Sequence, residues 1–368
     1  MRHGAVQAQR IRPIASVIIL LGVLLCSAGG ENLQADPLVS PTPLRVSEAS
    51  SASGPSEQSA ASVQALVIGG NGVLYAGSFG HGVFRTLDRG ATWARVGGGI
   101  TDPFILSLAS GKDGAVYAGT FRGGVFRSRD DGNSWQPVNA GLKQLEVKAL
   151  LAVDHELFAG TGDGVYRMHG SEDRSEDHWT PVTSGLDDIL VHALARSADG
   201  TLFAGTSGKG VFRLSPRSTV WVRMRHGLKD HEGLIENFIR VLVIDRDQSI
   251  FAGTFDGGVF RSADGGLTWR PISRALPNDS IRGIVFSDQG VVVATGNGIF
   301  KTVDKGKQWI PVNSGLANLA VQVLIGSGDK GLYAGTSSGV FRSDDGFSWV
   351  AVNQGLEAGI APPPFLFR

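Results

Sequence analysis

A segment of about 40 residues recurs seven times along this chain, and this repetition limits the possible folds more than any other feature. One string in each repeat reads aliphatic residue, aromatic residue, Ala, Gly, then Ser or Thr. Its copies begin at Leu74, Val116, Leu157, Leu202, Ile250 and Leu332, and Val292-Val-Ala-Thr is a shortened copy. The seven tryptophans fall one to a repeat, at Trp93, Trp135, Trp179, Trp221, Trp269, Trp309 and Trp349. Units of this kind cannot bury their apolar faces alone, so they must pack on one another.

Each repeat contains four short apolar runs separated by Gly, Asp and Asn. In the second repeat they are Ile105-Leu-Ser-Leu, Val116-Tyr-Ala-Gly, Gly124-Val-Phe-Arg and Ser134-Trp-Gln-Pro-Val. Runs of this length rich in Val, Phe, Tyr and Trp are typical of strands, and no stretch has sustained helical periodicity. The pattern predicts an all-β fold, a seven-bladed β-propeller of four-stranded antiparallel blades. The first run of each repeat would be innermost and the Trp run outermost. No blade combines strands from both ends of the chain, so the means of ring closure stays open.

The N-terminus is typical of an export signal. Arg2, Arg10 and Arg12 precede an apolar run over residues 14–25, and small residues follow it. This run is shorter than the roughly 20 residues of a membrane span, so we expect a signal peptide over 1–28, cleaved after Ala28. Lipidation of Cys26 and an uncleaved anchor are the alternatives, although Leu25 stands where lipoprotein signals carry a small residue. We therefore expect a periplasmic or secreted protein that meets a membrane only through this segment or a lipidated Cys26.

The remaining boundaries follow from composition. Residues 37–62 are dominated by Ser, Ala and Pro and cannot bury enough surface to offset their ordering entropy, so 29–62 is expected to be a disordered tether. The propeller should span 63–356, with a C-terminal tail over 357–368. The 34 basic and 34 acidic residues cancel, which argues against nucleic-acid binding. A single cysteine excludes an intramolecular disulfide. We expect a monomer.

A turn between the third and fourth runs is the most specific motif. Thr86-Leu-Asp-Arg-Gly-Ala-Thr-Trp93 recurs as Ser128-Arg-Asp-Asp-Gly-Asn-Ser-Trp135, and again before Trp269 and Trp309, with a copy one residue shorter before Trp349. The carboxylate can accept backbone N–H groups across the turn, and the Gly permits positive φ. We predict a structural role for Asp88, Gly90, Trp93, Asp130, Gly132, Trp135, Asp264, Gly266, Trp269, Asp304, Gly306, Trp309, Asp344, Gly346 and Trp349.

These turns resemble the Asp-box, or BNR, repeat, whose pattern is Ser/Thr-x-Asp-x-Gly-x-Thr-Trp. Propellers with this repeat include sialidases, xyloglucan-active glycosidases, sortilin-type receptors and propellers similar to photosystem II assembly factors. The resemblance covers about 290 residues and implies the fold, but it leaves the function open.

The residues of this sequence do not match the sialidase site that the resemblance implies. Such a site has a Tyr nucleophile, an Arg triad and an Arg-Ile-Pro motif. The four tyrosines, Tyr75, Tyr117, Tyr166 and Tyr333, all occupy strand positions of the repeat, and the motif is missing. We predict no catalytic residue, no metal site and no cofactor; if the protein is an enzyme, a glycosidase is the expected class.

A basic residue closes the third run of every repeat, and this persistence favours a structural role in each blade. The seven are expected to pair with carboxylates or stack on the Trp rings: Arg85, Arg127, Arg167, Arg213, Arg261, Lys301 and Arg342.

Binding residues are expected where one repeat differs from the others. Repeats three and four lose the Asp-box, and the connection over residues 223–237 is expanded. Within the expanded loop, the candidate binding residues are Arg225, His226, Lys229, His231 and Glu232. The expansion is also consistent with a surface loop that has diverged in sequence without a binding role. Turns between the second and third runs add Phe79, Phe121 and Phe255 as aromatic candidates, unless they pack within their turns. The preferred function is a non-catalytic scaffold that binds or assembles a protein partner, and the alternatives are a glycoside hydrolase or a glycan-binding module.

Overall fold

The computed structural model describes residues 60–169, 177–224, 226–228, 238–278, 280–287, 290–328 and 331–356. The chain divides into two compact units, Met1–Pro55 and Ser56–Arg368, and every described residue belongs to the second. The expected signal peptide, Cys26, most of the tether and the tail over 357–368 therefore lie outside the described residues. Within the described ranges, no helix has the length and apolarity needed to cross a membrane.

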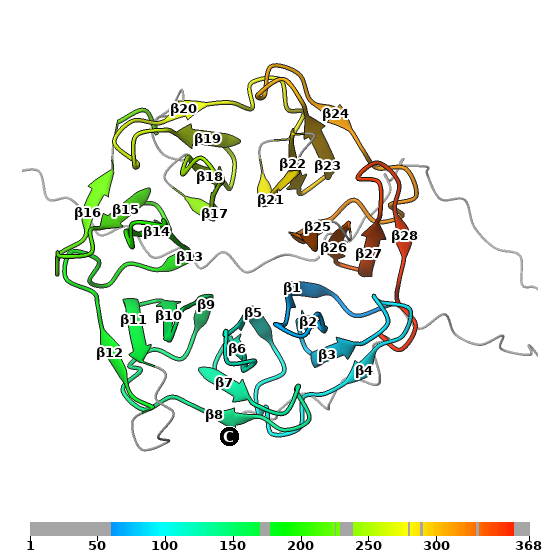
Figure 1. Cartoon of the computed structure of the whole chain (residues 1–368), viewed down its shortest axis with the longest axis horizontal. Helices are drawn as coiled ribbons and strands as arrows, with labels where there is room; N and C mark the ends of the chain where they lie inside the picture. The colour runs from blue at the N-terminus through cyan, green and yellow to red at the C-terminus, as the bar shows by residue number, and fades with distance from the viewer. Residues whose placement is uncertain are drawn as a thin grey trace, which may run out of the picture. The chain divides into compact units, whose positions relative to one another are not determined.

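The described residues form seven four-stranded antiparallel blades arranged in a ring (Figure 1), which confirms the predicted seven-bladed β-propeller. The innermost strands are β1 (Val63–Ile68), β5 (Ile105–Ser110), β9 (Val147–Val153), β13 (Val191–Arg196), β17 (Ile239–Ile244), β21 (Ile281–Ser287) and β25 (Val321–Gly326). The second strands are β2 (Leu74–Ser78), β6 (Val116–Thr120), β10 (Glu156–Thr161), β14 (Leu202–Thr206), β18 (Ile250–Thr254), β22 (Gly290–Thr295) and β26 (Leu332–Thr336).

The outer half of each blade is shorter. The third strands are β3 (Gly82–Thr86), β7 (Val125–Ser128), β11 (Gly164–His169), β15 (Val211–Leu214), β19 (Val259–Ser262), β23 (Gly298–Thr302) and β27 (Gly339–Ser343). The outermost strands are β4 (Ala94–Arg95), β8 (Gln136–Pro137), β12 (Trp179–Pro181), β16 (Val222–Met224), β20 (Arg270–Pro271), β24 (Ile310–Pro311) and β28 (Val350–Ala351).

The apolar core lies between blades. Strands β2, β6, β14, β18 and β26 are buried at all five positions because a neighbouring blade covers each face of the sheet. Seven hydrophobic clusters occur among the described residues, and each joins two adjacent blades. One of them brings Tyr75 of the first blade against Phe126 and Trp135 of the second. The sequence supports this arrangement because each repeat supplies apolar residues to both faces of its central strands.

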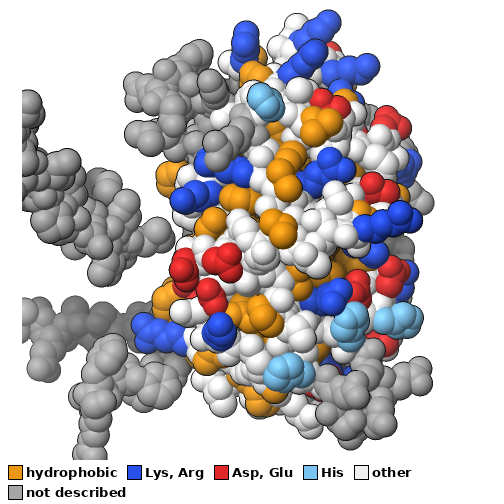
Figure 2. All heavy atoms as spheres, turned by 90° about the vertical axis from the view of Figure 1, so that its left-hand side faces the viewer, with side chains coloured by type: hydrophobic (Ala, Val, Ile, Leu, Met, Phe, Trp, Pro, Cys, Tyr) orange, Lys and Arg blue, Asp and Glu red, His pale blue; other side chains and the backbone are white. Residues whose placement is uncertain are grey.

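Basic and acidic side chains are interspersed on the outer side of the ring drawn in Figure 2. This side carries no single-sign surface, in keeping with the equal counts of basic and acidic residues. A local concentration of one charge would therefore stand out from its surroundings.

Each Trp holds its blade to the blade before it. The indole Nε1 of Trp135 donates to the Val96 oxygen at 2.6 Å, and its main-chain N–H donates to the Gly98 oxygen at 2.8 Å. Nε1 of Trp179, Trp221, Trp309 and Trp349 makes the corresponding bond to Val138, Val182, Ile272 and Val312. The Trp ring thus buries apolar surface while its polar atom is satisfied.

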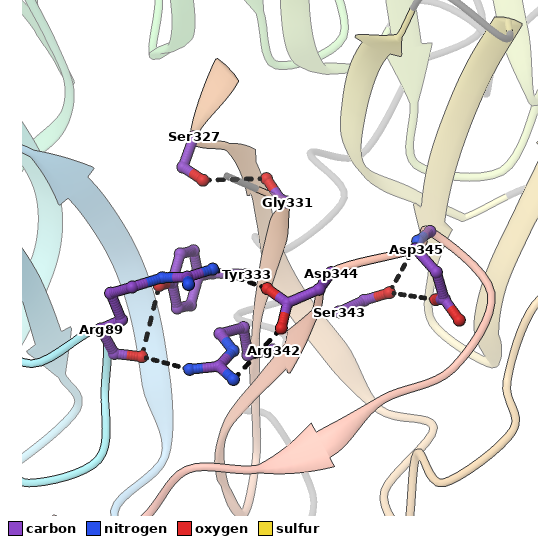
Figure 3. A network of polar contacts seen from close by, with 9 residues as sticks. Arg89, Ser327, Gly331, Tyr333, Arg342, Ser343, Asp344 and Asp345 are labelled. Atoms are coloured by element: carbon purple, nitrogen blue, oxygen red, sulfur yellow. Dashed lines mark hydrogen bonds and ion pairs between the residues drawn. The ribbon is translucent and has the colours of Figure 1, made fainter. Parts of the chain in front are cut away.

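The ring closes by the same contacts, without strand exchange. All four strands of the first blade come from the start of the propeller and all four of the seventh from its end. Nε1 of Trp93 donates to the Val352 oxygen at 2.7 Å, and the N–H of Ala61 donates to the Leu356 oxygen at 2.9 Å. Figure 3 shows the polar contacts beside this seam, where Arg89 of the first blade lies 2.7 Å from Asp344 of the seventh.

Candidate binding site at the inner rim

The propeller has two unlike faces. In each blade, the turn between the second and third strands and the connection to the next blade lie on one face, which we call the entry face. The turns carrying the Asp-box lie on the opposite face, which we call the box face. This division follows from the antiparallel order of the four strands.

Every innermost strand has a β-bulge at its second residue, next to the entry face. In β17, for example, Ile239 pairs with Thr254 and Val241 pairs with Gly253, so Arg240 is the extra residue. A bulged residue has no cross-strand partner and its side chain is re-aimed. The seven bulged residues are all half-buried: Gln64, Leu106, Lys148, His192, Arg240, Arg282 and Gln322.

Four consecutive members of this set are basic. We call Lys148, His192, Arg240 and Arg282, from the third to the sixth blade, the basic arc. Their side chains interact electrostatically: burial, Lys148 and Arg240 together lower the pKa of His192 to about 3. Burial and then Arg282 lower the pKa of Arg240 to about 10. The arc therefore carries three cations, with His192 held neutral between Lys148 and Arg240.

The arc is incompletely neutralised. Lys148 pairs with Glu146 at 2.7 Å, and Arg282 donates to Gln322 Oε1 at 2.5 Å. Within the described ranges, Arg240 Nη1, Arg282 Nε and His192 Nε2 are buried atoms without a hydrogen-bond partner. Burying polar groups without partners is costly, so such groups often mark a place that a ligand completes.

Aromatic side chains border the arc. The Arg240 guanidinium lies 5.3 Å from the centre of the Phe255 ring, and the His192 and Phe238 ring centres are 4.6 Å apart. Phe238 in turn lies 5.6 Å from Phe255, which is 47% exposed. Phe255 is one of the candidates nominated from the sequence, and the structure places it beside the basic arc. Phe238, just before β17, was missed because it belongs to no repeated turn.

The other two nominated phenylalanines gather at a separate place on the same face. Phe79 is 46% exposed and lies 4.8 Å from Phe104, centre to centre. The Phe121 N–H donates to the Phe104 oxygen, and the Arg122 guanidinium lies 5.1 Å from the Phe121 ring. Like Phe238, Phe104 directly precedes an innermost strand and was missed. This second aromatic group spans the first and second blades.

The expanded connection after the fourth blade is described only in part. Arg225, Lys229, His231 and Glu232 lie outside the described residues, so their role stays a prediction. His226 is exposed, and its main-chain oxygen accepts the Trp269 N–H at 2.9 Å. That is the contact Gly98 makes with Trp135, so the His226 backbone holds two blades together and only its side chain is available to a ligand.

The Asp-box turns are closed by their own hydrogen bonds. Asp88 accepts from the Thr92 hydroxyl at 2.6 Å, the Thr92 N–H at 2.8 Å and the Thr86 hydroxyl at 2.7 Å. These bonds, those from Thr92 first, lower the pKa of Asp88 to about 2. Asp130 and Asp264 make equivalent bonds and have pKa values of about 2; Asp304 lacks only the second hydroxyl.

The assignment of Asp344 to the last of these turns was wrong. Asp345 accepts from the Ser343 hydroxyl, the Ser348 N–H and the Ser348 hydroxyl, at 3.1, 2.8 and 2.5 Å. The carboxylate must stand two residues after the Ser, as Asp88 stands after Thr86, and the missing residue of the short copy falls after the Asp. Asp344 instead contacts Arg342 at 3.2 Å and Arg89 across the seam (Figure 3).

Four of the seven basic residues that close the third strands contact the next blade. Nη1 of Arg85 donates to the Asp131 oxygen in the next Asp-box turn, and Nη1 of Arg342 donates to the Arg89 oxygen at 3.3 Å. Arg127 pairs with Asp177 of the next blade at 2.6 Å, where both side chains are largely buried. The aromatic partner of Lys301 is Phe347, at 4.2 Å, rather than a Trp.

Among the described residues, no group of three or more His, Cys, Asp or Glu could hold a metal ion. The arrangement at the inner rim offers positive charge, unpaired donors and aromatic surface. It is suited to binding an anionic group.

The comparisons with known proteins agree on the fold. The model of one protein family, described as "DUF6242 beta propeller domain", matches residues 47–297 of this chain. No protein with a curated description matches the sequence.

Three solved structures are similar to this chain. The extracellular domain of a candidate one-component system from B. thetaiotaomicron is 18% identical with a TM-score of 0.64, over 77% of this chain and 38% of its own. The GH74 enzyme of Niastella koreensis is 16% identical with a TM-score of 0.62, over 81% and 55%. YCF48 bound to D1 peptide is 14% identical with a TM-score of 0.61, over 77% and 92%. This chain spans 38% and 55% of the first two chains, and at these identities the likeness shows the fold alone.

Proposed function

The chain belongs to the DUF6242 beta-propeller family, and from this premise we propose that it is an exported, non-catalytic Asp-box propeller that binds an acidic segment of a partner protein. The observation that carries the proposal is the basic arc on the inner rim. Lys148, Arg240 and Arg282 put three cations on one side of the ring, and their surroundings leave donors of Arg240 and Arg282 without partners.

Carboxylates are the natural complement of this site. Arg binds them with paired donors, and a charge-assisted hydrogen bond is about twice as strong as a neutral one. The aromatic pair Phe238 and Phe255 would contact apolar side chains next to the acidic residues. A polypeptide supplies both kinds of group along a short length. The solved complex of YCF48 with D1 peptide is a precedent for a propeller of this fold that binds a peptide.

The test uses a fluorescein-labelled decaglutamate peptide and anisotropy titration of the purified protein. We expect saturable binding that weakens as salt is raised, and no binding of a decalysine peptide. The double variant Arg240→Ala with Arg282→Ala should bind roughly tenfold or more weakly. Arg270→Ala, on the exposed outermost strand of the same blade as Arg240, is the matched control and should bind like the wild type. Equal affinity of the double variant and the wild type would refute the arc as the binding site.

The location outside the cytoplasm is part of the proposal and rests on the N-terminal sequence. Two solved relatives are extracellular domains from B. thetaiotaomicron, which is consistent with export. N-terminal sequencing of the mature protein tests it: a start at Gly29 is expected for cleavage after Ala28. A lipidated Cys26 would instead start the mature chain at that residue, and an intact Met1 in the cytoplasmic fraction would contradict export.

Glycan binding or hydrolysis is the second candidate, and the exposed ring of Phe79 against Phe104 favours it. Aromatic faces of this kind stack on sugar rings, and GH74 enzymes share the fold. Incubation with xyloglucan separates the possibilities. Release of reducing sugar would indicate an enzyme, and saturable binding without release that is lost in Phe79→Ala would indicate a glycan module.

A further inference from the structure

On the box face, a regular contact between adjacent blades has an apolar half and a polar half. A Cβ at Gly132 would lie 3.1 Å from Val96, and one at Gly90 would lie 3.1 Å from Val352, so the Asp-box turn of the second blade and that of the first each cover a valine of the preceding blade. The same turn also offers a main-chain oxygen to a basic residue of that blade. Arg85 donates to the Asp131 oxygen in this way.

In the fourth blade, the turn between the third and fourth strands has the length of an Asp-box turn but lacks the residues that define the motif. Leu214 and Trp221 stand seven residues apart, as Ser128 and Trp135 do. Between them, the positions of the Asp, the Gly and the second hydroxyl residue hold Pro216, Ser218 and Val220. Leu214 also replaces the first hydroxyl residue, so none of the side-chain hydrogen bonds that close the Asp-box turns can form.

A groove of about 710 Å³ lies between the third and fourth blades at this place. Val182, the counterpart of Val96 and Val352, lines it and is only half-buried, whereas those two are 9% exposed. Leu202 and Leu214 add apolar surface, and Thr183, Ser184 and Ser218 are among its polar lining residues. The volume is in the range of known ligand sites.

The polar half of the contact is also incomplete. Arg167 of the third blade lines the groove and corresponds to Arg85 and Arg342. Its Nη1, the atom through which Arg85 and Arg342 contact the turn oxygen, lies 3.6 Å from Glu156, beyond a good hydrogen bond. Its buried Nε has no partner in the described part of the chain, as is also true of Arg342. Val182 and Arg167 thus lack the two contacts that one Asp-box turn supplies elsewhere in the same ring.

We propose that this groove binds a tight turn of a partner polypeptide. The turn presents a main-chain oxygen to Arg167 and a glycine over Val182, as the Asp-box turns of this protein do for Arg85 and Val96. A polypeptide is the indicated ligand because the protein itself fills the equivalent space at other blade interfaces with main-chain atoms. The groove lies on the opposite face from the basic arc, so this proposal stands independently of the function proposed above.

The probe is a head-to-tail cyclised peptide of residues 128–134, a copy of the Asp-box turn of the second blade. Its binding is followed by calorimetry and by the NMR signals of Val182 and the Arg167 side chain. We expect saturable binding in the millimolar range or tighter. Arg167→Ala should weaken binding roughly tenfold, since a charged donor is lost. Arg85→Ala, the matching position where a turn is already in place, should leave it unchanged.

A second variant closes the groove from within. Leu214→Ser, Pro216→Asp, Ser218→Gly and Val220→Thr together restore the Asp-box without changing the length of the chain. This variant should melt at a higher temperature than the wild type and should no longer bind the peptide. The proposal is overturned if millimolar peptide does not saturate the wild type, or if Arg167→Ala binds as the wild type does. If the restored variant does not fold, peptide binding by Arg167→Ala and by Arg85→Ala still tests the proposal.

Discussion

The indole of Trp93 hydrogen-bonds to the main-chain oxygen of Val352, a residue 259 positions further along the chain. Every other bond of this kind joins residues about 40 positions apart, as Trp135 and Val96 do at a separation of 39. The seam therefore has the same Trp hydrogen bond as the internal interfaces, although no direct chain connection joins its two blades. Its stability depends on side-chain packing and a few hydrogen bonds.

Leu356 should matter to ring closure. It is fully buried at the seam, and Leu316 occupies the matching position between the sixth and seventh blades. Either leucine changed to Ala should cost about 2–5 kcal/mol of unfolding free energy through the cavity it leaves. Hydrogen exchange distinguishes them: Leu356→Ala should increase exchange in the first and seventh blades, and Leu316→Ala in the sixth and seventh. The same exchange pattern in both variants would show that the seam is not a separate weak point.

Asp345 and Asp344 are adjacent but have different roles. Asp345→Ala removes four hydrogen bonds that close its turn, and Asp344→Ala removes exposed ion pairs, which contribute little. Thermal melts at neutral pH should show a clear loss of stability for Asp345→Ala and little change for Asp344→Ala. The pKa of Asp345 lies well below its usual value, so its contribution should persist at pH 4 and fade only in stronger acid. Equal melting temperatures for the two variants would contradict the reassignment.

His192 should make the propeller less stable in acid. Its pKa is about 3 in the folded protein and about 6.5 when unfolded, so the unfolded chain takes up a proton first as the pH falls. Between pH 6.5 and 3 the free energy of unfolding should decrease by up to about 1.4 kcal/mol per pH unit from this residue. Urea unfolding of His192→Gln should lack that part of the slope. In addition, Arg240→Ala should raise the pKa of His192, as followed by NMR, because a nearby cation is removed; an unchanged pKa would show that the two side chains do not interact.

Gly132 and Gly72 form a matched pair for the Asp-box contact. Both have positive φ, 86° and 82°, so an Ala at either is strained by roughly 1–2 kcal/mol. A Cβ at Gly72 meets nothing within 4 Å, whereas one at Gly132 would press on Val96 at 3.1 Å and Tyr75 at 3.3 Å. Gly132→Ala should therefore be the more destabilising of the two in urea denaturation. Equal losses would mean that φ alone requires the glycine and that the contact with Val96 is loose.

The fold was predictable because each of the seven repeats carries the same sequence pattern. The alternation of apolar runs and Gly-rich turns and the single Trp per unit gave the strands, their order and the number of blades. Closure at the seam was not predictable, since it depends on Ala61 and Leu356 meeting across the whole length of the propeller. The assignment of Asp344 failed because a one-residue deletion leaves two adjacent aspartates, and only the hydrogen-bond geometry decides between them.

The candidate site was predicted less well. Phe255 was found because it stands in a repeated turn, but the basic arc was missed. A bulge leaves no mark in the pattern of apolar residues, so the second residue of each innermost strand looked like any solvent-facing strand position. A signal was nevertheless present: the residues on either side of Arg240 and His192 are uniformly aliphatic or small from repeat to repeat, while this one position varies between neutral and basic residues.

That freedom has a consequence for how such a protein can change. A bulged residue takes no part in the pairing of its strand, so replacing it leaves the register of that strand unaltered. If the inner rim binds a ligand as proposed, exchanges at these seven positions would change the ligand preference and keep the strand pairing of the blades. On the proposed function, the ring would be a fixed frame that carries seven variable contact positions, and a relative with acidic or aromatic residues there would select a different partner on the same frame.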